Sequence, residues 1–236
     1  MARESLRLGL EHHKTIATRL KGALTEHRMI GEMLTYSLRE TYIDMMKIKI
    51  IVGTGGLLSH APNRAQSMLI MTDAWQPEGV TKIYQDSVFM MPHLGVLSTA
   101  YPDAAWNVFD KDCLVRVGTV IAPKGEAAQG EEVVDINIHG ENETIFEGEL
   151  RFGEVTMVPL PERAKATAVM KPGRHFDMGA GEGKTLETTI EGGVVGVVID
   201  TRGRPMSLPQ DDEERRNTLM RWFRSLNAYP KEMSFD

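Results

Sequence analysis

Residues 47–56 decide the fold class, and they read KIKIIVGTGG. The first six form a short run rich in β-branched side chains, which predicts a buried strand that enters a tight turn at Gly53. Consecutive glycines at the carboxyl end of a strand leave the backbone free of side chains, so that a flat ring or a phosphate can approach it. A glycine cluster also forms purely structural turns, and that interpretation stays open.

The residues after this turn alternate between helical and strand patterns. Pro62 suits the first turn of a helix, and residues 76–79, Gln-Pro-Glu-Gly, bring that helix to an end. A second strand is predicted over residues 80–84, and Pro92 and Pro102 each open a further helix. This order of strand, helix, strand and helix is typical of an α/β fold with a partly parallel sheet.

The regions on either side have different patterns. Apolar residues at helical spacing over residues 3–46 predict two helices with a break between about residues 22 and 31. Short alternating stretches after residue 112 predict a β-rich module, and Asp211 with Glu214 forms a capping box that starts a terminal helix. The predicted division is an α/β part, a β-rich module and a helical tail, over residues 1–112, 113–205 and 206–236.

The composition is that of an ordinary globular protein. The 236 residues include 27 Lys and Arg and 33 Asp and Glu, a formal net charge of −6, and 42% are hydrophobic. This acidic balance lacks the basic surface that nucleic-acid binding needs, and no apolar stretch approaches the roughly 18 residues of a membrane span. A single Cys excludes a disulfide framework and thiolate metal motifs. We expect a cytoplasmic protein that binds neither nucleic acid nor membranes.

Two features come close to known phosphate and metal motifs without meeting their requirements. Residues 179–185, GAGEGKT, need a preceding glycine to form a Walker loop, but Met178 stands at that position. Arg174 and Lys184 remain candidate contacts for an anion. The seven histidines form no metal-binding pair, and no base accompanies Cys113, so that we expect neither a metal site nor a reactive thiol.

Five stretches follow one another along the chain in a characteristic order: IVGTGGLLSHAP (51–62), DAWQPEGVTKIYQDSVFMMPHLGVLS (73–98), FDKDCLVRVGTVIAP (109–123), MKPGRHFDMGAGEGK (170–184) and EGGVVGVVIDTRGRPMSLP (191–209). Together they resemble the glutamate mutase MutL family, whose members are accessory proteins of cobalamin-dependent mutases. The resemblance is strongest over about residues 40–210 and faint before them.

The resemblance implies an actin-like ATPase fold, in which a strand and its glycine-rich turn contact the adenosine of ATP. The nucleotide contacts that it implies in this chain are Gly53, Thr54, Gly55, Gly56 and Ser59. It also implies an interdomain hinge at a small residue of a later helix, which Gly95 matches. The cofactor of the complete protein would be ATP or ADP with Mg²⁺.

The family resemblance also implies a function. Its members are thought to act as reactivating chaperones, which use ATP to release damaged cobalamin from a mutase or aminomutase so that intact adenosylcobalamin can replace it. The implied partner is therefore a cobalamin-dependent mutase or aminomutase, and direct binding of cobalamin by this chain is not expected.

The chain departs from the superfamily pattern on the phosphate side. Two Asp-x-Gly phosphate loops should be present, one near the amino terminus and one midway. Neither is found before Gly53, and Asp177-Met178-Gly179 and Asp200-Thr201-Arg202-Gly203 both follow it, which is the wrong order. We therefore expect the carboxyl-terminal half of an actin-like ATPase core, then the β-rich module and the terminal helix, with the amino-terminal ATPase half as a second partner.

The missing loops limit the expected activity. Phosphoryl transfer needs Mg²⁺ and donors around the γ-phosphate, so the chain alone is not expected to hydrolyse ATP, and no residue is assigned a catalytic role. The alternative is a non-catalytic scaffold of a mutase complex whose glycine turn is purely structural. A small-molecule kinase of the same superfamily is disfavoured for want of phosphate loops.

Overall fold

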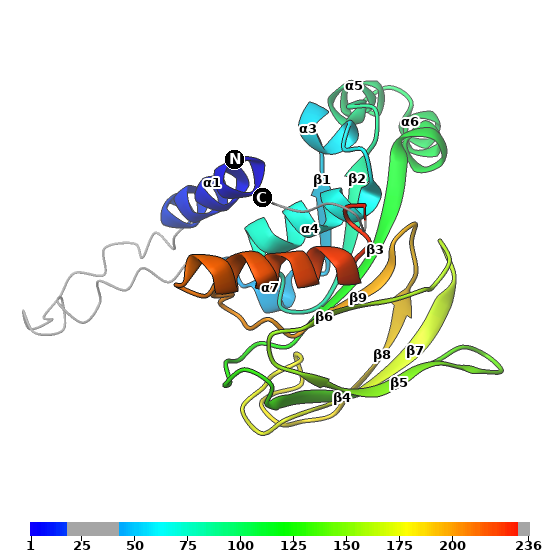
Figure 1. Ribbon diagram of the computed structural model, residues 1–236. Helices are drawn as coiled ribbons and strands as arrows, with labels where there is room; N and C mark the ends of the chain where they lie inside the picture. Colours follow the sequence, from blue (N-terminus) through cyan, green and yellow to red (C-terminus); the bar gives the residue numbers. More distant parts are fainter. Residues whose placement is uncertain (18–42, 231–236) are drawn as a thin grey trace, which may run out of the picture.

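The structure is a computed structural model that describes residues 1–17 and 43–230. The first of the two predicted amino-terminal helices is α1 (Ala2–Ile16). The predicted break and the second of these helices fall on residues 18–42, outside the described part of the chain. The other described residues form two sheets and the helices around them (Figure 1).

The first sheet is mixed and has five strands, which include the two strands of the predicted α/β region. In spatial order its strands are β1 (Ile50–Gly53), β2 (Gly79–Asp86), β3 (Leu114–Ala122), β9 (Gly196–Asp200) and β6 (Val155–Val158). β1 is parallel to β2 and β3 is parallel to β9, while β2 pairs with β3 and β9 with β6 in antiparallel fashion. The predicted partly parallel sheet is therefore confirmed. The prediction that the strand before Gly53 is buried was wrong, because β1 is an edge strand in which Ile50 and Val52 are exposed.

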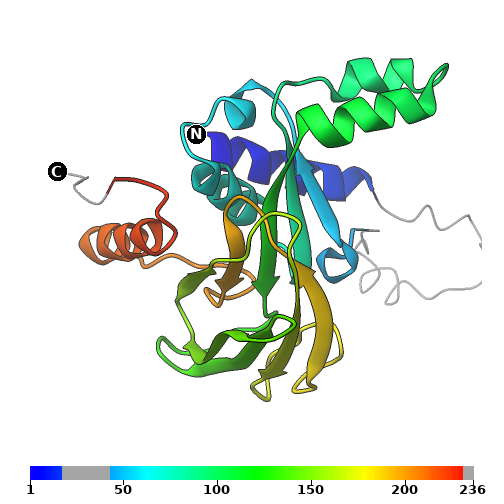
Figure 2. The same ribbon diagram turned by 90° about the vertical axis from the view of Figure 1, so that its right-hand side faces the viewer.

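The second sheet has four antiparallel strands and lies against one face of the first (Figure 2). In spatial order they are β5 (Thr144–Arg151), β4 (Glu132–His139), β7 (Lys165–Pro172) and β8 (Leu186–Glu191). Successive residues of a strand point to opposite faces, so Ile121 and Ile199 share one buried cluster with Ile136 and Met170 of the second sheet. This contact forms the first hydrophobic core.

Helices cover the opposite face of the five-stranded sheet. They are α3 (Gly56–Ser59), α4 (Arg64–Trp75) and α7 (Asp212–Ser225). Met68 and Met71 of α4 and Trp222 of α7 form a second core with Val120 and Val198 of the sheet. The apolar residues at helical spacing in these helices therefore pack on the sheet, as amphipathic helices do.

The helix ends follow local chemistry. The Asn63 side chain accepts a hydrogen bond from the backbone N–H of Ala65 at 2.9 Å, and Asp211 accepts one from Glu214 at 2.8 Å, which confirms the predicted start of α7. Gln76 ends α4 in the left-handed conformation, with φ of 43°. A short 3₁₀ turn, η1 (Met45–Lys47), precedes β1.

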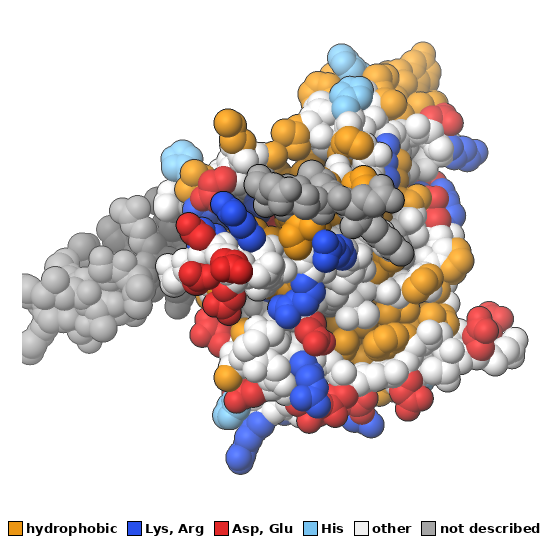
Figure 3. Space-filling view, viewed as in Figure 1, with side chains coloured by type: hydrophobic (Ala, Val, Ile, Leu, Met, Phe, Trp, Pro, Cys, Tyr) orange, Lys and Arg blue, Asp and Glu red, His pale blue; other side chains and the backbone are white. Residues whose placement is uncertain are grey.

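Three short helical segments lie beyond the carboxyl ends of β1 and β2, at the top of Figure 1. They are α5 (Met91–Leu97), α6 (Pro102–Val108) and the π turn η2 (Phe109–Cys113), and both α5 and α6 have proline in the first turn, as predicted. Hydrophobic side chains gather at this end of the molecule (Figure 3), and they include Val96, Leu97, Tyr101, Trp106 and Val108.

The strands group differently from the predicted division of the chain. β3, β6 and β9 belong to the region expected to form a separate β-rich module, yet they complete the sheet that begins with β1 and β2. The boundary drawn between residues 112 and 113 therefore runs through one sheet. The alternation of apolar and polar residues shows that one face of a strand is buried, but it does not show which strand is its neighbour. Strands that belong to different sheets therefore have similar sequence patterns. Within the described residues, no helix has the length and apolarity needed to cross a membrane.

Candidate functional site

The glycine turn lies at the carboxyl edge of the parallel pair β1 and β2. Gly53 is in register with Gln85, so both strands end together there. Gly55 has a φ of 101°, which L-residues rarely adopt, and a Cβ built on it meets nothing within 4 Å. A Cβ on Gly56 meets only Cδ2 of His60, at 3.9 Å. The backbone of Gly55 and Gly56, beside the exposed Thr54, is therefore open to a ligand.

Two of the predicted nucleotide contacts, Gly53 and Ser59, are buried in the interior of the protein. A Cβ on Gly53 would lie 2.4 Å from Sδ of Met71 and 2.7 Å from Cδ1 of Leu58, so this glycine is required by packing and does not offer open backbone. Ser59 is buried, and its hydroxyl donates a hydrogen bond of 2.8 Å to the backbone oxygen of Asp86. These two residues hold α3 against the sheet, so the surface open to a ligand is smaller than the one expected from the sequence.

Asp86, the last residue of β2, is buried and organises the segment that leads to α5. Its carboxylate accepts hydrogen bonds from the backbone N–H groups of Val88, Met90 and Met91 at 3.3, 3.2 and 2.8 Å. The Thr54 hydroxyl lies 3.4 Å from the same carboxylate. Asp86 therefore connects the glycine turn to the start of α5. Sequence reasoning missed it, although an acidic residue that ends the strand beside the turn is a usable signal.

Gly95, the predicted hinge residue, lies on α5 and lines a small apolar groove between α5 and α6. The groove has a volume of about 200 Å³, and Trp106 and Phe109 lie on its other side. A Cβ on Gly95 meets nothing within 4 Å, so no neighbour among the described residues requires glycine there. A hinge at this position stays a prediction.

The contrast between two glycines of this region gives a stability test. Gly95→Ala adds a methyl group in open space to a helix and is expected to raise the free energy of unfolding by up to about 1 kcal/mol. Gly53→Ala is expected to lower it by about 1–3 kcal/mol, because the new Cβ overlaps the side chains of Met71 and Leu58. Urea unfolding of both variants measures the difference, and equal midpoints would contradict the packing described for Gly53.

The two candidate anion contacts lie far from the glycine turn. Arg174 and Lys184 are exposed on the loop between β7 and β8. Met178 of this loop approaches the start of β2, where a Cβ on Gly79 would lie 3.0 Å from its carbonyl oxygen. The glycine turn lies at the other end of β2, and the 8 residues of β2 span roughly 25 Å. The structure therefore does not bring Arg174 and Lys184 to the predicted nucleotide site.

The Asp-x-Gly sequence at residue 177 forms a closed turn. Oδ1 of Asp177 accepts hydrogen bonds from the backbone N–H groups of Gly179 and Gly181 at 2.7 and 2.9 Å. The same N–H groups would have to face a phosphate in a phosphate loop. This turn therefore does not supply the missing phosphate contacts.

A buried ionic cluster surrounds Asp200 at the end of β9. Its Oδ2 accepts hydrogen bonds from Arg202 at 2.7 Å and from Arg204 at 2.8 Å. Arg202 also lies 2.8 Å from Oδ1 of Asp73, and its guanidinium stacks 4.8 Å from the ring centroid of Trp222. Burial opposes ionisation, yet the two arginines hold the pKa of Asp200 well below its usual range. The cluster joins β9 to α4 and α7, and its carboxylate is not free for Mg²⁺.

Two further residues that could carry chemistry, Cys113 and His60, have contacts that indicate a structural role. Cys113 is buried, and burial, with Asp86 and Asp112 nearby, raises the pKa of its thiol, which agrees with the expected inert thiol. His60 lies at the end of α3, where its backbone N–H bonds to Gly56. In residues 1–17 and 43–230, no group of three or more His, Cys, Asp or Glu side chains is arranged to hold a metal ion.

Comparison with known proteins supports the family suggested by the sequence. The model of the family described as MutL protein matches residues 1–113, a range that contains the glycine turn, Asp86 and Gly95. The searches of curated proteins and of solved structures give no match. The resemblance to the MutL family is therefore confirmed over residues 1–113.

Proposed function

Residues 1–113 match the MutL family, and from this premise we propose that the chain supplies the adenosine side of the ATP site in a chaperone-like ATPase that reactivates a cobalamin-dependent mutase or aminomutase. In this proposal ATP drives the exchange of damaged for intact cofactor on the mutase. The phosphates and Mg²⁺ are held by an amino-terminal ATPase half, because the described residues of this chain offer no phosphate loop.

One observation carries the nucleotide part of the proposal. The open backbone of Gly55 and Gly56 lies just outside the carboxyl ends of two parallel strands, which is where α/β sheets bind their ligands. A purine ring can lie flat against this backbone because no side chain rises from Gly55 or Gly56. Thr54 beside them is exposed, and a hydroxyl can donate or accept a hydrogen bond. The residues present therefore fit an adenosine.

The same geometry suggests how nucleotide binding is passed on. Asp86 is bonded to Thr54 on one side and to the three N–H groups before α5 on the other. A ligand that moves Thr54 changes the surroundings of this carboxylate and biases the position of α5, which carries Gly95. The proposed hinge movement therefore begins at the turn and passes through Asp86.

Gly56→Leu tests the proposed adenosine contact. The Cβ of this leucine meets only Cδ2 of His60, at the ordinary contact distance of 3.9 Å, and the side chain should cover the open backbone and abolish binding of ADP. We expect the unmodified chain to melt at a higher temperature with ADP, because a ligand at 100 times its Kd adds about 2.7 kcal/mol of stability. Thermal melts and calorimetric titration with ADP measure the effect.

The matched control for this test is Gly9→Leu, because Gly9 has nothing within 4 Å of its Cβ position and lies on α1, away from the glycine turn. This variant should bind ADP as the unmodified chain does. Equal binding of ADP by the Gly56→Leu variant, or no binding by the unmodified chain, would contradict the adenosine site.

A scaffold in a mutase complex is the second candidate, and the surroundings of Gly53 favour it. Packing against Met71 and Leu58 explains that glycine, and the φ of Gly55 explains the next one, without any ligand. A chain that co-purifies with a cobalamin-dependent mutase but shows no melting shift with ADP would support the scaffold.

A further inference from the structure

The hairpin formed by α5 and α6 buries little of its own surface. Each of these helices has 7 residues, and only Leu94 of α5 and Ala105 of α6 are buried. Helices of this length are marginal in water unless they pack on another surface. Figure 2 shows both helices, in green, standing out from the sheets at one end of the molecule. The hairpin therefore has an outer face that no other described part of the chain covers.

This outer face is apolar. Phe89, Tyr101 and Trp106 are 50%, 65% and 61% exposed. A whole aromatic side chain has about 150–250 Å² of surface, so these three residues leave about 300–400 Å² uncovered. The other exposed hydrophobic residues here are Val88, Val96, Leu97 and Val108. Together the seven residues, which we call the α5–α6 face, expose an apolar area on the order of 500 Å².

Charge is nearly absent from the same stretch of chain. Charged residues make up 25% of the whole sequence, yet residues 88–109 contain only one, Asp103. Few charges combined with aromatic residues and methionine are typical of the core of a protein–protein interface. A helix that binds a membrane surface is rich in Lys and Arg, and this stretch has neither. The composition therefore favours a protein as the partner of this face.

Phe89 is held in an unusual conformation that presents its ring to the outside. Its φ is 58°, in the left-handed region that bulky residues rarely adopt. The carboxylate of Asp86 stabilises this turn by accepting hydrogen bonds from the backbone N–H groups of Val88, Met90 and Met91. Because the ring stays half exposed, the strained turn does not serve packing within the described residues. Such strain is typical of contact sites.

The groove between α5 and α6 gives the face a shape that a helix can fit. Its volume is about 200 Å³, and small residues, Gly95, Ser98 and Ala105, contribute to its lining. A Cβ on Gly95 meets nothing within 4 Å, so the groove is open above this residue. Apolar grooves of this kind accept the exposed side chains of a helix. The two helices also carry such side chains themselves, in Val96 and Trp106.

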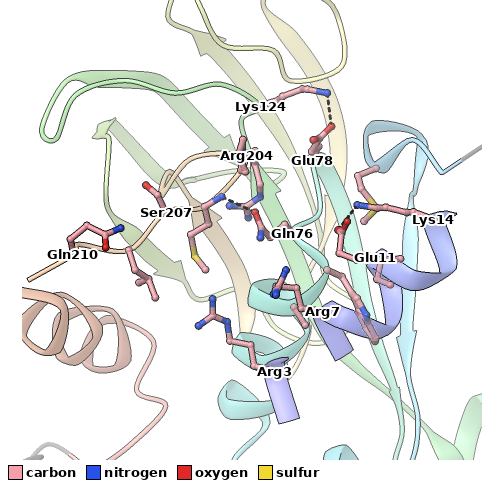
Figure 4. A pocket seen from close by; sticks show the side chains of 17 residues that line it. Arg3, Arg7, Glu11, Lys14, Gln76, Glu78, Lys124, Arg204, Ser207 and Gln210 are labelled. Carbon is pink, nitrogen blue, oxygen red and sulfur yellow. Dashed lines mark hydrogen bonds and ion pairs between the residues drawn. The ribbon is translucent and has the colours of Figure 1, made fainter. Parts of the chain in front are cut away.

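A wider cleft elsewhere on the molecule has no comparable unused surface. It lies between α1, the end of α4 and residues 204–210 and has a volume of about 830 Å³ (Figure 4). Each cationic side chain that lines it has a carboxylate partner within the chain. Figure 4 shows two of these pairs, Lys14 with Glu11 and Lys124 with Glu78. The charges of this cleft are therefore already satisfied, in contrast to the uncovered apolar face.

We infer that the α5–α6 face is the contact surface of a homodimer, in which two copies of this chain pack α5 and α6 against each other about a two-fold axis. The area agrees with this partner, because a standard interface buries about 800 Å² on each side and roughly 60% of it, or about 500 Å², is apolar. In a two-fold contact each surface meets itself, so a highly charged face would repel its copy, whereas this stretch carries only Asp103.

The shape of the face agrees with a second copy as well, since each copy offers both a groove and the exposed side chains that can enter the groove of the other. The dimer goes beyond the proposed function and does not depend on the adenosine contact.

Sedimentation equilibrium of the full chain without nucleotide tests the dimer. At about 10 μM the unmodified chain should have twice the mass of one copy, because interfaces of this size have Kd values of about 1 μM or below. Val96→Glu should weaken the association at least about a hundredfold, since it places a carboxylate in an apolar contact opposite its own copy. Trp106→Ala, which adds no charge, should weaken it at least about tenfold.

The matched control is Leu8→Glu on α1. Leu8 is 54% exposed, so the variant adds the same charge at an exposed apolar position of another helix, and the dimer should keep its affinity within about twofold. Val96 is 74% exposed, so its replacement should leave the fold intact, and circular dichroism checks this. Gly56→Leu should also remain a dimer, which separates this contact from the proposed adenosine site.

Three results would contradict the homodimer. The first is the mass of a single copy at all concentrations of the unmodified chain. The second is an equal affinity in the Val96→Glu and Leu8→Glu variants, which would place the contact elsewhere. The third is a single copy that co-sediments with phosphatidylcholine vesicles unless Val96 is replaced, which would assign the face to a lipid surface.

Discussion

Asp200→Asn is expected to lower the free energy of unfolding by about 3–5 kcal/mol, because it removes the counter-charge of two buried arginines. The side chains of Asp200, Arg202 and Arg204 are 0%, 1% and 2% exposed, so water cannot compensate for the lost carboxylate. Asparagine keeps the shape of the side chain, so the lost stability measures the removed charge and not a cavity. Urea unfolding at neutral pH measures it.

The matched control is Asp212→Asn, which removes the same charge from an exposed pair with Arg215 on α7. Such surface pairs contribute only about 0–1 kcal/mol. A loss in the Asp200 variant no larger than in this control would contradict the role given to the buried cluster.

The pH dependence of the same variant provides an independent check. The folded state lowers the pKa of Asp200 below its ordinary value of 3.8, so its stabilising effect is complete above that pH. As the pH falls below this value, the unfolded chain takes up a proton that the folded chain does not, and stability is lost. The difference in unfolding free energy between the unmodified chain and Asp200→Asn should therefore shrink below about pH 4.

Gly118→Ala is expected to lower the free energy of unfolding by about 2–4 kcal/mol. Gly118 of β3 is in register with Gly196 of β9, and a Cβ on it would lie 2.1 Å from the backbone oxygen of Gly196. Backbone cannot move aside as a flexible side chain can, so the two central strands would have to separate. Because β3 and β9 carry residues of both hydrophobic cores, this shift would disturb the whole sheet.

Gly148→Ala on β5 is the control for this prediction. Its Cβ position lies 3.4 Å from Cζ of Phe146, which is an ordinary contact, and the change should alter stability by less than about 1 kcal/mol. Urea midpoints compare the two variants. Similar stability of both would mean that β3 and β9 are not as closely paired as described.

Local chemistry made a large part of the fold predictable. The apolar run before Gly53, the prolines at residues 92 and 102 and the cap at Asp211 act within a few residues, and each lies at the end of an element as expected. Pro62 was expected in the first turn of a helix but lies just before Asn63, the N-cap of α4. The carboxyl edge that carries the glycine turn was predictable for the same reason. The MutL family could also be identified from short stretches of sequence, and the comparison confirms it over residues 1–113.

The partners of these elements were not predictable in the same way. β6 and β9 join the five-stranded sheet while β7 and β8, which lie between them in the chain, join the other sheet. Their alternating patterns are alike, since each strand buries one face, and only the long-range pairing distinguishes them. The region after residue 112, expected to form one β-rich module, therefore contributes strands to both sheets.

The sequence by itself determined the order of helices and strands, the resemblance of residues 1–113 to the MutL family and the place of the glycine turn. Only the tertiary structure decided that Gly53 is packed while Gly55 and Gly56 are open, that Asp86 joins the turn to α5, and that Asp200 pairs with two buried arginines. The physical reason is that capping and periodicity act over a few residues, whereas packing and charge pairing depend on groups brought together from distant parts of the chain.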